Sequence, residues 1–234
     1  MNLYEISNLQ LAIAFIPAVL ALAVFYYWTV GAGNASYAVG RMLLQLLLIG
    51  YALTFIFETE HPGVVLAVLT VMLVAAAWIS LNSVGEQRTG WLGKAALAIG
   101  VVGLAVLALV TQLVVAVDPW YAPQYVIPLA GMIFANTMNA VSLAAERYLS
   151  ERNDQHDYES ARRRAFKAAM IPVVNSLLAV GLVSLPGMMT GQILSGVSPL
   201  IAARYQIVVM TMLFGAAGLS TAWFLVMLRP KPAA

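Results

Sequence analysis

The side chains best suited to guiding a polar solute lie late in the chain, in residues 184–206, where helix-breaking residues are frequent. This segment overlaps the longest charge-free run, residues 168–203, which exceeds the roughly 20 residues that cross a bilayer as a helix. Proline and glycine there indicate an interrupted helix, and non-helical backbone at membrane depth is tolerated only where protein or a water-filled cavity covers it. We therefore predict a path or gate in this broken segment, with these candidate residues: Pro186, Gly187, Met188, Met189, Gly191, Gln192, Arg204, Tyr205 and Gln206.

A second polar set precedes this segment in two apolar stretches. Asn136, Asn139 and Glu146 are spaced so that they share one face of a helix, and Asn175 and Ser176 occupy the following stretch. Buried amides in lipid are costly without a partner, so both sets should face the interior of a helix bundle. We predict that Asn136, Asn139, Asn175 and Ser176 line the path. Interhelical hydrogen bonding without contact to a solute is the alternative.

Metal-ligating residues are scarce. The chain has no cysteine and only two histidines, which excludes a thiolate site and disfavours an imidazole cluster. The weak candidates are Glu58, Glu60 and His61, which offer oxygen and imidazole donors, and Met188 and Met189, whose thioethers suit monovalent copper better than ferrous iron. An ordinary polar loop and simple hydrophobic packing are the alternatives, and we predict no bound cofactor.

Residues 146–167 form the most charged part of the chain and carry both signs. Such a mixture at helical spacing favours a helical element on the cytoplasmic face of a membrane, either docking a partner or simply joining two spans as a solvated hairpin. The candidate docking residues are Glu146, Arg147, Glu151, Arg152, Glu159, Arg162, Arg163 and Arg164. The sequence has no GxxxxGK[ST] loop, so any ATP hydrolysis would belong to a separate polypeptide.

The composition, 62% hydrophobic and 9% charged over 234 residues, predicts an all-α polytopic membrane protein. We treat residues 1–234 as a single transmembrane domain, in contact with lipid and without a nucleic-acid partner. The acidic, non-basic N-terminus differs from a cleavable signal peptide. Seven spans are expected: 8–30 with a kink at Pro17, 37–57, 63–82, 95–117, 125–145, a sixth that begins near residue 168, and 205–228.

The basic residues determine the predicted orientation. All of the lysines and arginines except Arg204 fall in connections on one side of the seven spans, near the start of the second span (Arg41) or in the C-terminal tail. Such a bias marks the cytoplasmic side. The N-terminus is then outside and the C-terminus cytoplasmic, which requires an odd number of spans.

Three segments carry a family resemblance: VGLVSLPGMMTGQILSGVSPLIAARYQIVVM at 180–210, GMIFANTMNAVSLAAERYLSE at 131–151, and AAMIPVVNS at 168–176. Together they resemble the signature of the FetB-type iron-export permeases of ABC transporters, which include plant permease halves linked to aluminium tolerance. The resemblance implies metal efflux through a cell-membrane permease that works with a separate cytosolic ATPase. Two features depart from the family pattern: the charged segment lacks a LALGAT-like sequence, and Ser198 stands where an acidic residue often precedes the proline.

The leading hypothesis is therefore a non-enzymatic permease subunit of an ABC exporter, working as a homodimer on two ATPase subunits that bind the ATP. Iron as the exported metal comes from the resemblance alone. Two alternatives belong to other functional classes: an ATP-independent channel or facilitator, and a membrane scaffold or assembly protein whose polar faces only hold helices together.

Overall fold

The structure, a computed structural model, describes residues 6–58 and 61–230, and these are predominantly helical with no β-strand. The predicted all-α class is confirmed. The chain divides into two compact units, Met1–Glu58 and Thr59–Ala234. Each is described below by itself.

The first unit contains α1 (Asn8–Ala14), α2 (Ile16–Tyr27) and α3 (Ala32–Phe57). Ser7 and Gln10 form a capping box that satisfies the first amide groups of α1. The predicted kink is found as a break at Phe15, because the ring of Pro17 cannot continue the preceding helical turn. Each helix of this unit is without a buried residue, so these apolar surfaces remain to be covered by lipid or protein.

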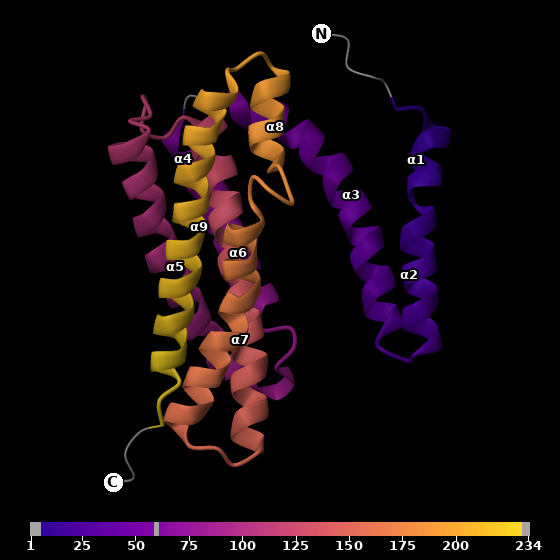
Figure 1. The fold of residues 1–234 in the computed structure, drawn as a ribbon, viewed down its shortest axis with the longest axis vertical. Helices are drawn as coiled ribbons and strands as arrows, with labels where there is room; N and C mark the ends of the chain where they lie inside the picture. The colour runs from indigo at the N-terminus through magenta and orange to yellow at the C-terminus, as the bar shows by residue number, and fades with distance from the viewer. Residues whose placement is uncertain (1–5, 59–60, 231–234) are drawn as a thin grey trace. The chain divides into compact units, whose positions relative to one another are not determined.

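The second unit has an upright bundle, shown in Figure 1. Its elements are α4 (Pro62–Ser80), the 3-10 turn η1 (Gly85–Gln87), α5 (Arg88–Ala108), the π-helical turn η2 (Leu109–Val114), α6 (Pro123–Asn153), α7 (Tyr158–Ala179), α8 (Gly187–Leu194) and α9 (Pro199–Met227). Prolines open α4, α6 and α9. Proline suits a first helical turn because its missing N–H would have no partner there.

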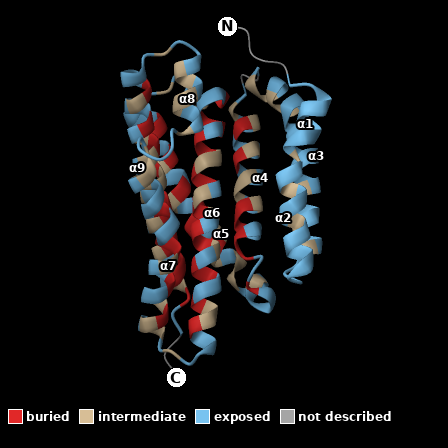
Figure 2. Cartoon of the chain, turned by 45° about the vertical axis from the view of Figure 1, so that its right-hand side comes forward, coloured by how far each residue is buried: buried red, intermediate tan, exposed pale blue. Residues whose placement is uncertain are grey.

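Small residues form much of the core between α6, α7 and α9. The alanines with no exposed surface include Ala144, Ala145, Ala161, Ala165, Ala169, Ala216 and Ala217. Figure 2 shows buried residues along the inner faces of this bundle. Small side chains let helix backbones approach closely in membranes, where packing replaces the hydrophobic effect as the driving force.

Six helical segments are long and apolar enough to span a membrane within the described residues, one fewer than the seven spans expected. The missing segment is α7, whose first half carries charged residues. α7 begins beside the C-terminal end of α6, and α8 lies beside the N-terminal end of α9 (Figure 1). The two pieces together therefore return the chain along the bundle, although neither is among the six candidate spans.

The charged segment 146–167 is a hairpin: the last turns of α6, a short connection and the first turns of α7. The Tyr148 hydroxyl donates to the carbonyl of Leu228 at 3.4 Å, and the Tyr158 hydroxyl donates to that of Leu225 at 3.1 Å. These hydrogen bonds place the hairpin at the C-terminal end of α9. Both segments thus lie at one end of the unit, and which side of a membrane this end faces stays a prediction.

Candidate functional site

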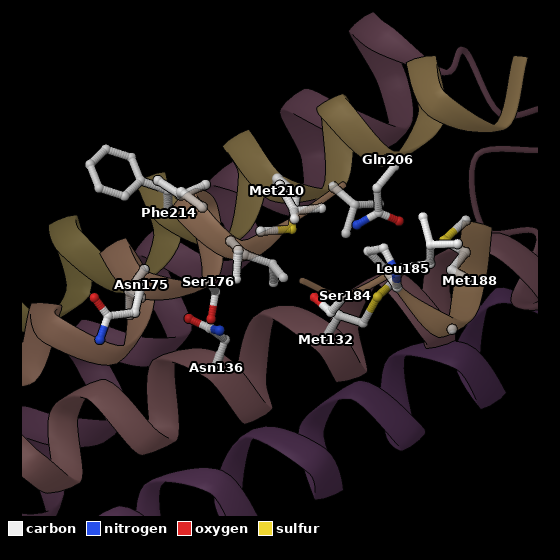
Figure 3. Close-up of a pocket in the computed structure, with 18 residues that line it drawn as sticks. Met132, Asn136, Asn175, Ser176, Ser184, Leu185, Met188, Gln206, Met210 and Phe214 are labelled. Carbon is white, nitrogen blue, oxygen red and sulfur yellow. The ribbon is translucent and has the colours of Figure 1, made fainter. Parts of the chain in front are cut away.

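A cavity of the second unit, with a volume of about 520 Å³, lies where α7 stops and α8 begins. Its walls come from α6, the end of α7, the non-helical connection, the start of α8, and α9 (Figure 3). The uncharged polar side chains and methionines in the lining are Asn136, Asn175, Ser176, Ser184, Gln206, Met132, Met188 and Met210. Among the described residues that line it, there is no Asp, Glu, Lys, Arg or His.

Gln206 is the buried polar side chain of this cavity, with 6% of its surface exposed. Its Oε1 atom has no hydrogen-bond partner within the described protein, and neither has Oδ1 of Asn136. Figure 3 shows both amides directed into the space between α6 and α9. A buried polar atom left without a partner costs about 1–3 kcal/mol. Neither oxygen is open to the cavity as the side chains stand, so each would contact a ligand or a bound water after a small rotation of its amide.

The connection between α7 and α8 is a turn built on Ala179 and Gly181. The backbone N–H groups of Val183 and Ser184 donate to the Ala179 carbonyl at 2.8 and 3.2 Å, and the N–H of Gly181 donates to the Ser184 carbonyl at 2.9 Å. Gly181 has a φ angle of 82°, a backbone conformation that residues with a Cβ atom rarely adopt. Pro186 then caps α8 and accepts a hydrogen bond from the Thr190 hydroxyl at 3.1 Å. The interruption at residues 180–186 therefore has a defined, hydrogen-bonded geometry, whereas residues 187–194 of the predicted broken segment 184–206 form the helix α8.

A second cavity, of about 300 Å³, lies nearer the N-terminal end of α6. Gln192 and Tyr205 line it, and Oε1 of Gln192 is buried without a hydrogen-bond partner in the described protein. Met188 and Val209 line both cavities. These two side chains therefore form the partition between the two spaces.

The predicted path residues divide into three groups. Asn136, Asn175, Ser176, Pro186, Gly187, Met188 and Gln206 line the larger cavity. Gln192 and Tyr205 line the smaller one, while Asn139, Met189, Gly191 and Arg204 line neither. The sequence analysis did not single out Met132, Ser184 or Met210. Met132 precedes Asn136 by four residues and Met210 follows Gln206 by four, so helical periodicity would have placed both on the cavity face.

Glu151 organises the charged hairpin from within. Only 2% of its side chain is exposed, and it pairs with Arg147 one turn earlier on α6. Its Oε2 atom lies 3.3 Å from Nη1 of Arg164 and 3.4 Å from Nε2 of His156. Arg152 is exposed, and its Nη1 donates to the His156 carbonyl at 2.8 Å. Glu151 is thus inaccessible to a docking partner, whereas the other candidate docking residues remain at least partly exposed.

The weak metal candidates stay a prediction. Glu58 ends the first unit and His61 caps α4 in the second, while Glu60 lies outside the described residues. Within the described chain no three His, Asp or Glu side chains are grouped to hold a metal ion. Met188 lines both cavities, but Met189 lines neither.

The fold and cavity define a multi-pass α-helical membrane protein with an uncharged cavity, mainly apolar with a few polar side chains, beside the interruption between α7 and α8. Its sequence matches the family described as "Uncharacterised protein family (UPF0014)" over residues 7–159 and 156–231. The chain belongs to this family.

Named relatives extend over most of the chain. The UPF0014 membrane protein slr1647 of Synechocystis is 40% identical, covering 81% of this chain and 79% of its own length. The probable iron export permease protein FetB of Escherichia coli is 34% identical, covering 94% of this chain and 90% of its own length. Protein ALUMINUM SENSITIVE 3 of Arabidopsis is 32% identical over 90% and 81% respectively. No solved structure matches the chain.

Proposed function

We propose that this chain is the membrane-spanning permease subunit of an ABC-type exporter of iron or a related metal species. In this proposal it works as a homodimer in the cell membrane, with a separate cytosolic ATPase that binds the ATP. The observation that carries the proposal is the cavity beside the break between α7 and α8, into whose mainly apolar lining several amide and hydroxyl side chains are set. Discontinuous helices in transporters commonly surround the substrate site. The name of the Escherichia coli relative supports iron and export.

The two cavities supply the proposed route. The larger one lies between α6 and α9 near their middle, and the smaller one lies towards the N-terminal end of α6. A substrate moves from the first to the second when Met188 and Val209 separate. α8 carries Met188 and packs mainly against α9, so a small shift of this short helix suffices to open the partition.

The charged hairpin is the proposed contact with the ATPase. It continues directly into α6 and α7, which line the larger cavity. Through the hydroxyls of Tyr148 and Tyr158 it is also bonded to the end of α9. Closure of the ATPase subunits would thus move three of the cavity's walls together. Such coupling requires one element that contacts both the ATPase and the walls of the cavity. In this proposal the hairpin is that element.

The test is coexpression of the chain with a candidate cytosolic ABC ATPase from the same genome. We expect the two to co-purify, ATP hydrolysis to rise on association, and cell iron under iron load to fall only when both are active. An ATPase with its phosphate-binding lysine replaced is the matched control. Nucleotide-independent flux in liposomes would instead identify a facilitator. Absence of both flux and co-purification would leave a scaffold role and overturn the proposal.

A further inference from the structure

The larger cavity differs from a site for a bare metal ion. Hard divalent cations prefer carboxylate and carbonyl oxygens, and a charge moved out of water is costly without a counter-charge or dense coordination. The described lining residues offer amides, hydroxyls and thioethers but no ionised group. A positively charged ion placed there would lack a compensating negative charge.

The volume of the cavity leads to the same conclusion. A divalent ion with six waters occupies about 180 Å³, taking about 30 Å³ for each water. The cavity measures about 520 Å³, which lies within the range of pockets that hold small organic molecules. A hydrated ion would fill about a third of it and make few contacts with the walls.

The unsatisfied groups specify the polarity of the ligand. Oε1 of Gln206 and Oδ1 of Asn136 are acceptors without donors, and Gln206 is buried. They come from different helices and point into one space (Figure 3). A ligand with N–H or O–H groups on its surface would satisfy both, whereas a purely apolar ligand would leave both unpaired. The methionines Met132, Met188 and Met210 provide adaptable apolar contacts around them.

We infer that the cavity binds an electrically neutral molecule with hydrogen-bond donors on its surface, received by Gln206 and Asn136. Within the proposed function, on which this inference rests, the exported metal is carried as a neutral organic chelate rather than as a bare ion. The same chemistry would also admit a metal-free polar molecule of similar size.

Ferric hydroxamates provide the probes. Ferric tris(acetohydroxamate) has no net charge and directs N–H groups outward, whereas its N-methyl analogue is also neutral but lacks these donors. Ferrous ion and anionic ferric citrate are the charged comparisons. The full chain in lipid nanodiscs would be dialysed against each of these four iron species, labelled with radioactive iron. The iron that stays with the protein would then be measured.

We expect the N–H complex to be retained at least about tenfold more tightly than its N-methyl analogue, because one or more hydrogen bonds are lost. Gln206→Leu should remove that difference and leave binding of the N-methyl complex nearly unchanged, which isolates the contact between this amide and the ligand. Asn136→Leu should act in the same direction. Asn139→Leu, on the same helix but outside both cavities, should bind as the wild-type protein does.

Retention of ferrous ion or ferric citrate equal to or above that of the neutral complex would overturn the inference. It would also be overturned if both neutral complexes bound equally, or if neither was retained. In each case metal export by cells could persist, so the proposed function would be judged separately. Displacement of the complex by metal-free acetohydroxamic acid at similar concentration would support the neutral class and identify the organic molecule as the ligand. Failure of such displacement would identify the metal complex.

Discussion

At the scale of single residues, the partition between the two cavities is the feature most open to test. Met188 and Val209 contact both spaces, and Met188 belongs to the short helix with fewest neighbours in the bundle. Its unbranched side chain fills irregular gaps and adopts several rotamers. A steric barrier of this kind can open without rupture of any hydrogen bond.

Met188→Ala should therefore join the cavities and produce flux of the neutral ferric complex through liposomes without nucleotide. Met188→Leu should stay closed, because it keeps the volume and removes only the sulfur. Met189→Ala is the matched control, since this neighbouring methionine lines neither cavity. If the leucine variant leaked as much as the alanine variant, sulfur chemistry rather than bulk would close the path.

Glu151→Gln should lower the free energy of unfolding of the detergent-solubilised protein by about 1–2 kcal/mol, measured by thermal denaturation. The glutamate is buried and meets both Arg147 and Arg164, but these arginines are half exposed, and water can partly replace the lost carboxylate. Glu159→Gln is the control in the same hairpin. Its 2.6 Å pair with Arg162 is exposed, so its loss should change stability by less than about 0.5 kcal/mol. Equal effects would show that burial of Glu151 has no energetic consequence.

Residue patterns predicted part of the site, and helix geometry explains the remainder. Asn136 and Gln206 were identified as path residues and both line the larger cavity. Asn139 was grouped with Asn136, but three residues advance a helix by about 300°, which turns its side chain past the edge of the cavity. Conversely, Met132 and Met210 lie one turn from the two amides and share their faces. Apolar side chains carry no signal that separates a cavity wall from lipid contact.

At the scale of elements, close approach of backbones defines the bundle. A Cβ atom at Gly103 of α5 would lie 3.0 Å from Cε1 of Phe134 and 3.2 Å from Cγ2 of Ile133 on α6. At Gly100 it would lie 2.9 Å from Cδ2 of Leu73 on α4. α5 therefore meets its neighbours through glycine. Sequence hydropathy finds such helices but does not show which face is in contact.

Gly103→Leu should destabilise the bundle by about 1–3 kcal/mol, because the added side chain has no space against α6. Gly93→Leu places the same residue in α5 at a position with nothing within 4 Å of the new Cβ, and should be neutral or slightly stabilising through helix propensity. Thermal unfolding followed by circular dichroism in detergent would compare them. Similar melting temperatures would mean that α6 moves away at little cost.

The sequence predicted a broken segment at 184–206, but the interruption begins earlier, at residues 180–186, and residues 187–194 form α8. The start of α7 was not predicted. Residues 146–167 looked like one charged element, but the helix ends at Asn153 and a new one begins at Tyr158. The N-cap at Asp157, whose Oδ1 atom accepts from the Ser160 N–H at 2.6 Å, defines this start. The spacing of charged residues does not show where one helix ends and the next begins, because the residues on both sides of such a turn have a helical pattern.

At the scale of the whole molecule, charge separates the two ends of the second unit. The end with the hairpin and the C-terminus of α9 carries nearly all of its basic residues, and ring contacts of Trp91 with Tyr148 and Phe224 join α5 to the same cluster. The positive end is the one expected in the cytoplasm. An ATPase would therefore meet a surface already bound together by aromatic packing and ion pairs.

Arg163→Glu is the sharpest test of that surface. Arg163 is exposed, and within the described residues it forms no ion pair, so reversal of its charge should leave melting unchanged. Stimulation of the partner's ATP hydrolysis should fall several-fold, and more so at low salt, because charge at an interface rim acts mainly on association. Asp118→Lys, an exposed charge reversal in the connection before the N-terminus of α6, should leave stimulation intact. If Arg163→Glu and Asp118→Lys behave alike, the ATPase does not dock on this hairpin, and the coupling route through α6 and α7 loses its starting point.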